Sequence, residues 1–218
     1  MHNSSAPYND RQEAGRALAV VLGGYAGKHP VVAGLPRGGV AVAAEISRAL
    51  GCDLDIIIAG KLRAPGNPEL AIGAVNEDGL LYLNETVIKG MRIDAGYVEQ
   101  EKKERMKAVQ ARLALYRAVK KKIPLHGRTV IIADDGLATG STMISAIQAA
   151  RAEGARAIIV AVPGGPQDTV ARISGMEEVE KVVCPVVPPF FYAVSQLYVS
   201  FNQVEDEEVL ALLKEFAG

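Results

Sequence analysis

Two adjacent carboxylates, Asp134 and Asp135, follow directly on an unbroken apolar run at positions 130–133. Such a run is typical of a strand that is buried on both faces of a parallel sheet. The carboxylates would then lie at the carboxyl end of that strand, where open α/β sheets bind their ligands. Because carboxylates accept hydrogen bonds from hydroxyl groups, this pair suits a ligand that carries hydroxyls.

A turn of small residues follows the carboxylates and opens an apolar-periodic helix. Its residues are Ala138, Thr139, Gly140, Ser141 and Thr142. The start of a helix offers unpaired backbone N–H groups and a positive dipole end to an anion. The alternative is an ordinary turn in which Ser141 or Thr142 caps the helix, but a cap needs neither two carboxylates nor a glycine-bearing turn. The whole pattern therefore favours a ligand with both hydroxyls and a phosphate, such as a ribose 5-phosphate.

The segment Val130–Thr142 resembles the signature with which type I phosphoribosyltransferases bind phosphoribosyl pyrophosphate (PRPP). Both have a hydrophobic run, paired acidic residues, a few small residues and then Thr-Gly-x-Thr/Ser. The resemblance implies that Asp134 and Asp135 face the ribose 2′- and 3′-hydroxyls and that the turn 138–142 surrounds the 5-phosphate. A Walker A loop is excluded, because its Gly-Lys-Ser/Thr is absent.

A second glycine-rich turn, at 34–39, follows the predicted strand Val31–Leu35. The backbone N–H groups of Arg37, Gly38 and Gly39 can line an anion pocket, and the Arg37 guanidinium can grip a diphosphate. The turn is similar to the pyrophosphate loop that the family carries after its first core strand, which often contains a strained or cis peptide. The alternative is a simple strand-to-helix turn in which Arg37 is solvated.

A third cluster, at 60–69, contains Lys61 and Arg63 followed by prolines and a glycine. We interpret it as a mobile cationic lid over a polyphosphate, and the resemblance implies that both cations lie near pyrophosphate. The alternative is an exposed loop with two solvated charges. The mixed charges at 99–105 predict a solvated helix face with i,i+4 ion pairs.

Prolines and aromatic residues concentrate at 182–201, although aromatic residues make up only 5% of the chain. The family binds its nucleobase under a variable hood, and rings here can stack on a flat acceptor. For any single ring we favour the alternative, that it fills a small satellite core beneath a loop.

The remaining pattern alternates helices and strands, which predicts an α/β fold with a Rossmann-like, mostly parallel sheet flanked by helices. Helices are expected from Asn9 or Asp10 to Gly23, over Gly38–Leu50 closed by Gly51, over about Ala95–Lys122, after Thr142 and over Glu205–Phe216; further strands are expected at Asp55–Ala59 and Ala157–Val162, with a hairpin at Ala71–Asn76 and Leu80–Asn84. We expect one domain over 1–218, with a core at about 31–162, a hairpin and lid insertion at about 61–122 and a small C-terminal hood at about 182–218.

The composition excludes several other classes. Basic and acidic residues nearly balance, 24 against 25, which gives no electrostatic footprint for nucleic acid. Two distant cysteines and three scattered histidines suggest neither a disulfide framework nor a metal site of protein ligands. We expect no membrane span and no signal peptide, and therefore a cytoplasmic protein.

The resemblance implies a phosphoribosyltransferase that moves the 5-phosphoribosyl group from PRPP, bound with Mg²⁺, to a nitrogen acceptor and releases pyrophosphate. Asp134, Asp135, Arg37 and Lys61 would be its catalytic residues; Arg37, Gly38, Gly39, Lys61 and Arg63 would hold pyrophosphate. The Mg²⁺ would be bound mainly by PRPP and water, bridged to Asp134 and Asp135. A regulator that senses PRPP or a nucleotide with the same site is the alternative, and a PRPP synthetase is less favoured. The acceptor is expected to be a small nitrogen compound, the nucleobase being the first choice, and a homodimer is possible.

Overall fold

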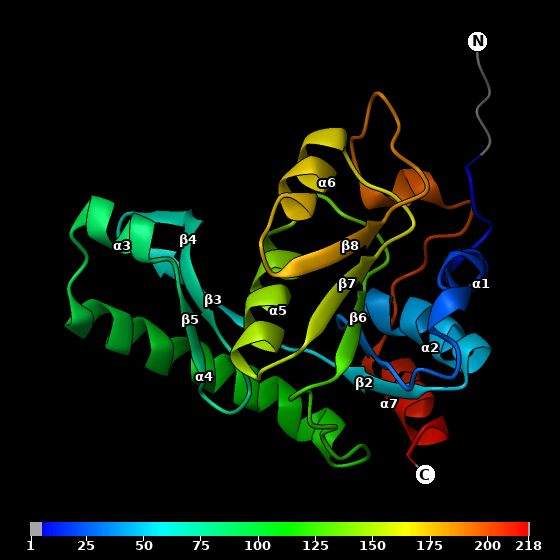
Figure 1. The fold of residues 1–218 in the computed structure, drawn as a ribbon, viewed down its shortest axis with the longest axis horizontal. Coiled ribbons are helices and arrows are strands. Elements are labelled where there is room, and N and C mark those ends of the chain that lie inside the picture. The colour runs from blue at the N-terminus through cyan, green and yellow to red at the C-terminus, as the bar shows by residue number, and fades with distance from the viewer. Residues whose placement is uncertain (1–5, 218) are drawn as a thin grey trace.

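A five-stranded parallel sheet forms the centre of the molecule in this computed structural model, which describes residues 6–217 (Figure 1). The strand order is β2-β1-β6-β7-β8, and every neighbouring pair is parallel. The strands span Val31–Gly34 (β1), Asp53–Ile56 (β2), Thr129–Ala133 (β6), Ala157–Ala161 (β7) and Val179–Val183 (β8). The predicted α/β class with a parallel sheet is therefore confirmed.

Helices cover both faces of this sheet, which explains why its strands read as unbroken apolar runs. The helices around the sheet are α1 (Arg11–Val21), α2 (Gly38–Leu50), α5 (Ser141–Ala152), α6 (Gln167–Ser174) and α7 (Asp206–Glu215), with short 3₁₀ turns at Gly23–Tyr25 and Val194–Leu197. Alternate strand residues enter different cores: Val32 and Ile131 pack with α1, α2 and α7, whereas Ala33 and Ile132 pack with α5 and α6. The start of α1 is fixed by Asp10, whose side chain accepts a hydrogen bond from the Glu13 N–H.

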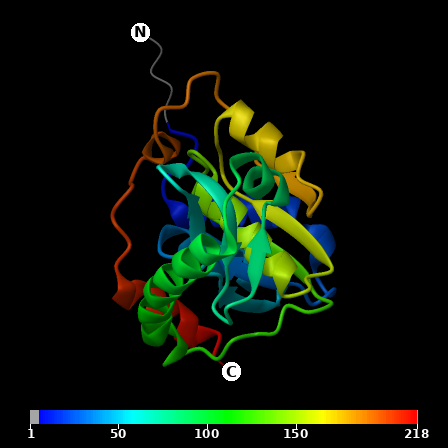
Figure 2. The same ribbon diagram turned by 90° about the vertical axis from the view of Figure 1, so that its left-hand side faces the viewer.

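The segment that follows β2 and precedes β6 in the sequence forms a second unit, which projects from the parallel sheet. It is the left-hand part of Figure 1, and Figure 2 shows it end on. We call residues 60–117 the arm. It consists of a three-stranded antiparallel sheet, β3 (Gly60–Ala64), β4 (Asn67–Val75) and β5 (Leu81–Leu83), with helices α3 (Glu85–Met91) and α4 (Ala95–Arg117). The arm has a small apolar core of its own, centred on Leu62, Ile72 and Val98.

The long helix α4 joins the arm to the rest of the molecule. Val98, near its start, belongs to the core of the arm, whereas Val109, Leu113 and Tyr116 belong to the main core. Helix α4 therefore contributes to both apolar cores. No helix in the described part of the chain is long and apolar enough to cross a membrane.

Several sequence-based assignments differ from the structure in their bounds or type. The strand expected at Asp55–Ala59 begins at Asp53 and ends at Ile56, because its pairing with β1 sets its register. Helix α4, expected to reach about Lys122, ends at Arg117. The N–H groups of Val119 and Lys120 both donate hydrogen bonds to the Tyr116 carbonyl. Helix α3, capped by the Asn84 side chain, was not anticipated.

A network of buried charges fixes the base of the arm to the parallel sheet. Arg117, at the end of α4, places Nη1 2.6 Å from Asp55 Oδ1 on β2 and Nη2 2.7 Å from Glu77 Oε1 in the β4–β5 turn. The Asp55 side chain is only 3% exposed, and its second oxygen accepts a hydrogen bond from the Ile123 N–H. Burial raises the pKa of Asp55, although the Arg117 charge opposes that shift.

We expect Arg117→Met to lower the free energy of unfolding by about 3–5 kcal/mol, because it leaves the Asp55 carboxylate buried without its cation. Denaturant unfolding measures this. Arg48→Met is the matched control: Arg48 also bridges two carboxylates, Glu45 and Glu215, but is exposed, so its loss is expected to cost about 1 kcal/mol or less. Equal losses in the two variants would contradict the role given to Arg117.

Candidate functional site

The two predicted carboxylates lie at the carboxyl end of β6, next to the carboxyl end of β1. Asp135 Oδ2 lies 2.8 Å from Arg11 Nε, and the side chains of both residues are largely buried. Asp134 Oδ1 accepts a hydrogen bond from the Asp135 N–H at 2.9 Å. The Tyr198 hydroxyl donates to the Asp135 carbonyl at 2.6 Å. The Asp135 side chain and its backbone carbonyl are thus both hydrogen-bonded to residues from other segments, Arg11 and Tyr198.

Arg11 is a site residue that sequence reasoning missed. It starts α1, and its Nη1 donates to the Asn202 carbonyl at 2.7 Å while its guanidinium lies 4.1 Å from the centre of the Phe201 ring. It therefore joins the first helix, the acidic pair and the C-terminal segment. The one signal that pointed to it is physical: two adjacent carboxylates at a buried strand end need a cation, but the sequence does not say which one.

The carboxyl group of Asp134 is the most strongly perturbed acid of the site. Its enclosure by protein atoms raises its pKa well above the usual range, and the adjacent negative charge of Asp135 raises it further. Arg11 compensates part of this effect, but it contacts Asp135 directly. Burial and the neighbouring charge thus both favour the protonated form of the Asp134 carboxyl more than in an ordinary aspartate.

This arrangement predicts a pH dependence of stability. Between the unfolded-state pKa of Asp134 and its raised native value, the native protein holds a proton that the unfolded chain has released, so stability falls as pH rises through that window. Asp134→Asn removes this contribution. We therefore expect the free energy of unfolding of Asp134→Asn, relative to the wild type, to increase with pH above about 4. Parallel pH profiles from denaturant unfolding would contradict the raised pKa.

The glycine pair after β1 packs directly on the two acids. A Cβ atom at residue 38 would lie 2.0 Å from Asp135 Oδ2, and one at residue 39 would lie 2.8 Å from Asp134 Cα. Only glycine therefore allows the start of α2 to approach the carboxylates this closely. The peptide bond between Pro36 and Arg37 is cis.

Arg37 precedes α2 and is in part exposed. Its Nη1 lies 3.4 Å from Glu205 Oε2, just before α7. The Arg37 side chain thus lies at the same end of the sheet as the acids. Among the described residues, however, its ionic partner is Glu205 and neither of the two aspartates. An incoming anion would compete with Glu205 for this guanidinium.

The predicted phosphate turn is supported from behind by α6. Thr169 Oγ1 donates to the Ala138 carbonyl at 3.0 Å, and Arg172 donates to the Thr139 carbonyl. Gly140 adopts a left-handed conformation, φ +72°, and serves as N-cap of α5 without a side-chain cap bond. The structure therefore does not show the alternative in which Ser141 or Thr142 caps the helix. The first-turn N–H groups of α5 remain suited to an anion.

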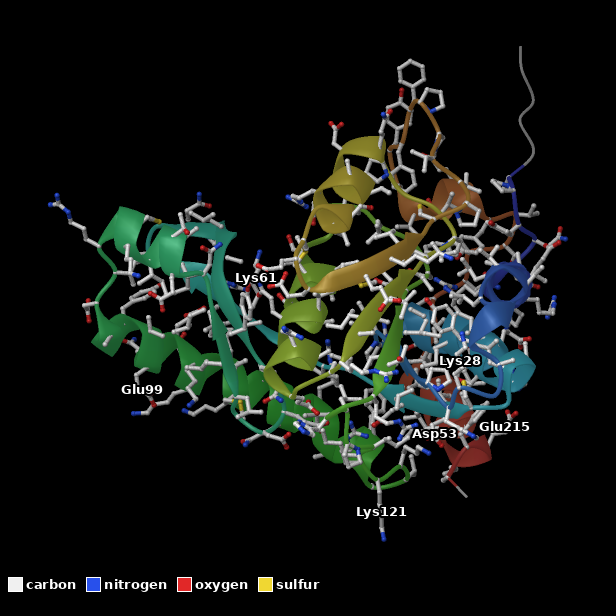
Figure 3. The ribbon with its side chains drawn as sticks, viewed as in Figure 1. Lys28, Asp53, Lys61, Glu99, Lys121 and Glu215 are labelled. Carbon is white, nitrogen blue, oxygen red and sulfur yellow. The ribbon has the colours of Figure 1, made fainter. Side chains whose placement is uncertain are left out.

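Lys61 and Arg63 lie in a strand and not in the loop that we expected, whereas their closing over a polyphosphate stays a prediction. They belong to β3, which pairs antiparallel with β4. The signal that was missed is the alternation at 60–64, where residues 60, 62 and 64 are buried. Both cations line a groove of about 250 Å³ between β3 and α4, which neither aspartate lines. Lys61 lies where the arm meets the core (Figure 3).

The aromatic residues of the C-terminal segment divide into two groups. Tyr198 is buried in a satellite core with Tyr8 and Leu197, with Phe191 packed against it, which agrees with the interpretation that we favoured for a single ring. Phe190 and Tyr192 are 72% and 87% exposed and fill no core.

The two cysteines are unpaired and partly buried, and His29 and His126 lie on the surface, whereas His2 lies outside the described residues.

Comparison with known proteins connects this geometry to one family. Residues 8–200 match the family described as "Phosphoribosyl transferase domain". The chain is 45% identical over 206 residues to "Putative phosphoribosyl transferase Rv0571c" of Mycobacterium tuberculosis, covering 94% of this chain and 46% of that protein, and equally similar to its counterpart MT0597 in strain CDC 1551. The chain thus spans about half the length of these curated relatives.

A solved structure shows the same fold. TT1426 from Thermus thermophilus is 41% identical and superposes with a TM-score of 0.91 over 97% of this chain and 99% of that one. The family match covers both acids, the glycine pair and the turn that precedes α5. By its sequence and by the geometry of this sheet end, the chain belongs to the phosphoribosyl transferase family.

Proposed function

We propose that this protein transfers the 5-phosphoribosyl group of PRPP to a nitrogen atom of a small, nucleobase-like acceptor and releases pyrophosphate. The observation that carries the proposal is the contact between Gly38 and Asp135, which brings the glycine-rich loop after β1 against the acidic pair after β6. PRPP carries both matching groups: its diphosphate would lie at the glycine-rich loop, and its ribose hydroxyls would lie at the acidic pair.

In this proposal the chain acts mainly by positioning and by electrostatic stabilisation. Asp134 and Asp135 hold the ribose hydroxyls and favour the positive charge that develops at the anomeric carbon. The turn 138–142 holds the 5-phosphate. Arg37 and the Gly38 and Gly39 amides stabilise the negative charge that develops on departing pyrophosphate, with Lys61 and Arg63 on the arm.

The proposed Mg²⁺ fits the acids only if the donor supplies most of its ligands. Among residues 6–217 no group of three or more His, Cys, Asp or Glu side chains is placed to hold a metal ion. Asp134 and Asp135 can hold the ion through bridging water, as is common for Mg²⁺. When bound, the ion would neutralise charge on the pyrophosphate oxygens.

Isothermal titration of PRPP into the wild type, with and without Mg²⁺, tests the proposal. We expect binding that depends on the metal, followed by pyrophosphate release when a panel of purine, pyrimidine and pyridine acceptors is added. Metal-dependent binding with no pyrophosphate release from any acceptor would favour the PRPP-sensing regulator. A folded wild type that does not bind PRPP would overturn both functions.

A further inference from the structure

The turn that we assign to the 5-phosphate contains no cation of its own. Residues 138–142 are Ala, Thr, Gly, Ser and Thr, which offer backbone N–H groups and hydroxyls but no full positive charge. A phosphate ester carries about two negative charges at pH 7. Phosphate loops of the Walker A type add a lysine to their backbone N–H groups. A cation for the phosphate would here come from another segment of the chain.

Helix α6 places an arginine against this turn. The helix lies beside the start of α5 (Figure 1), and Thr169 and Arg172, three residues apart, share one of its faces. Thr169 Oγ1 donates to the Ala138 carbonyl at 3.0 Å, and Arg172 Nη2 donates to the Thr139 carbonyl. A Cβ atom at Gly140 would lie 3.3 Å from Arg172 Nη2. The guanidinium thus lies within contact distance of the middle of the turn.

The charge of Arg172 is not neutralised by a carboxylate of the site. Arg11 is paired with Asp135 at 2.8 Å. Arg37 lies 3.4 Å from the Glu205 carboxylate. No carboxylate that the structure describes lies within 4.0 Å of Arg172, whose side chain is exposed and bonded to a neutral carbonyl. Among these three arginines, Arg172 is therefore the one whose charge remains for a ligand.

The contacts with α6 also direct the backbone N–H groups of the turn. In a trans peptide the carbonyl oxygen and the N–H of the next residue point in opposite directions. Because α6 holds the carbonyls of Ala138 and Thr139, the N–H groups of Thr139 and Gly140 point away from α6. Within the described residues neither N–H donates to a protein acceptor. A cation on the Thr139 carbonyl polarises the shared peptide group and makes the Gly140 N–H a stronger donor to an anion.

We propose that Arg172 is a positioning residue for the 5-phosphate of the donor, and that it supplies the charge by which the turn prefers a doubly charged phosphate ester. It acts through the peptide group between Thr139 and Gly140, from the side of the turn opposite to the ligand. This inference rests on the proposed transferase function, and it identifies a specificity-determining residue of that site outside the turn itself.

Two matched probes, ribose 5-phosphate and ribose 5-sulfate, test the inference by isothermal titration at neutral pH. Both carry the same sugar and a tetrahedral oxyanion, but the phosphate has about two negative charges and the sulfate has one. Because the electrostatic energy scales with the charge of the ligand, we expect Arg172→Gln to weaken phosphate binding about tenfold and sulfate binding about threefold. Arg172→Lys keeps the charge and can donate to a single carbonyl, so its affinities are expected within about twofold of the wild type.

Two further variants separate the charge from mere support of the turn. Thr169→Val removes the neighbouring hydrogen bond without a change in charge, and we expect it to weaken both probes by the same factor. Arg151→Gln is the matched control, because Arg151 is also an exposed arginine in the last turn of a helix and donates to a backbone carbonyl, that of Ala155. Arg151 lies at the other end of α5 from the phosphate turn, and both affinities should keep their wild-type values.

Three outcomes would overturn the inference and leave the transferase proposal in place, provided that the wild type binds ribose 5-phosphate and PRPP. The first is an equal loss of both probes in Arg172→Gln, which would make Arg172 a support like Thr169. The second is an unchanged phosphate affinity in that variant. The third is an Arg172→Lys variant that binds no better than Arg172→Gln. A folded wild type that binds neither ribose 5-phosphate nor PRPP would instead overturn the transferase proposal and this inference together.

Discussion

Asp135→Asn is expected to reduce turnover about 100-fold or more and to weaken Mg²⁺-dependent PRPP binding, while the protein stays folded. The reason is that an amide keeps one acceptor oxygen but loses the negative charge that we assign to the ribose hydroxyls and the developing cation, and removing one such group typically costs about 10²–10³ in rate. Folding is retained because the asparagine oxygen can still accept from Arg11 Nε, which now lies 2.8 Å from Asp135. Pyrophosphate release and PRPP titration measure the effect.

The thermal unfolding curve of the same variant is the necessary control. Arg11 keeps its hydrogen bond to the Asn202 carbonyl and its contact with the Phe201 ring, so its charge is not left wholly unpartnered. A variant that retains wild-type turnover would remove Asp135 from the mechanism. A collapse of thermal stability would assign Asp135 to the fold instead.

Gly38→Ala is expected to abolish detectable donor binding. The new Cβ would lie 2.0 Å from Asp135 Oδ2 and 3.0 Å from Arg11 Nε, and real Cβ atoms do not approach other atoms at the first of these distances. The Asp135–Arg11 pair or the start of α2 must therefore move, which displaces the acid and the glycine amides that we assign to the donor from their positions. Titration of PRPP with Mg²⁺ gives the readout.

Gly24→Ala provides a matched control for the same substitution. A Cβ at Gly24 would meet nothing within 4 Å, and we expect wild-type PRPP affinity in that variant. Unchanged PRPP binding in Gly38→Ala would mean that the loop after β1 does not shape the donor site. The comparison separates the steric effect at the acids from a general effect of replacing glycine.

The sheet and the acidic pair could be predicted from sequence because their signals are local. The run 130–133 alternates between two cores, so it has to be apolar throughout, and this marks β6 and the acids after it. The turn before α5 is likewise marked by consecutive small residues, at 138–142. In each case a single short segment contains both the strand and the chemistry.

Arg11, β3 and the end of α4 could not be predicted with the same method, because their roles depend on residues far away in the chain. Arg11 contacts Asp135 across a sequence separation of 124 residues. Helix α4 ends where Arg117 meets Asp55 and Glu77, which no local stop signal marks. Lys61 and Arg63 stand among prolines and a glycine that suggested a loop, but pairing with β4 makes their segment a strand.

The Arg11 contacts also bear on when the site forms during synthesis. Arg11 and Asn202, which share a hydrogen bond, are 191 residues apart in sequence. Helix α1 is translated before β6, whereas the Asn202 carbonyl and the Phe201 ring that hold its arginine are translated after β6. A ribosome-bound chain that has completed β6 therefore has both aspartates but lacks the groups that orient Arg11 toward Asp135. Competence for PRPP is accordingly expected to arise only once residues near 202 have left the ribosome, so that chains that stop before Asn202 would not sequester the donor.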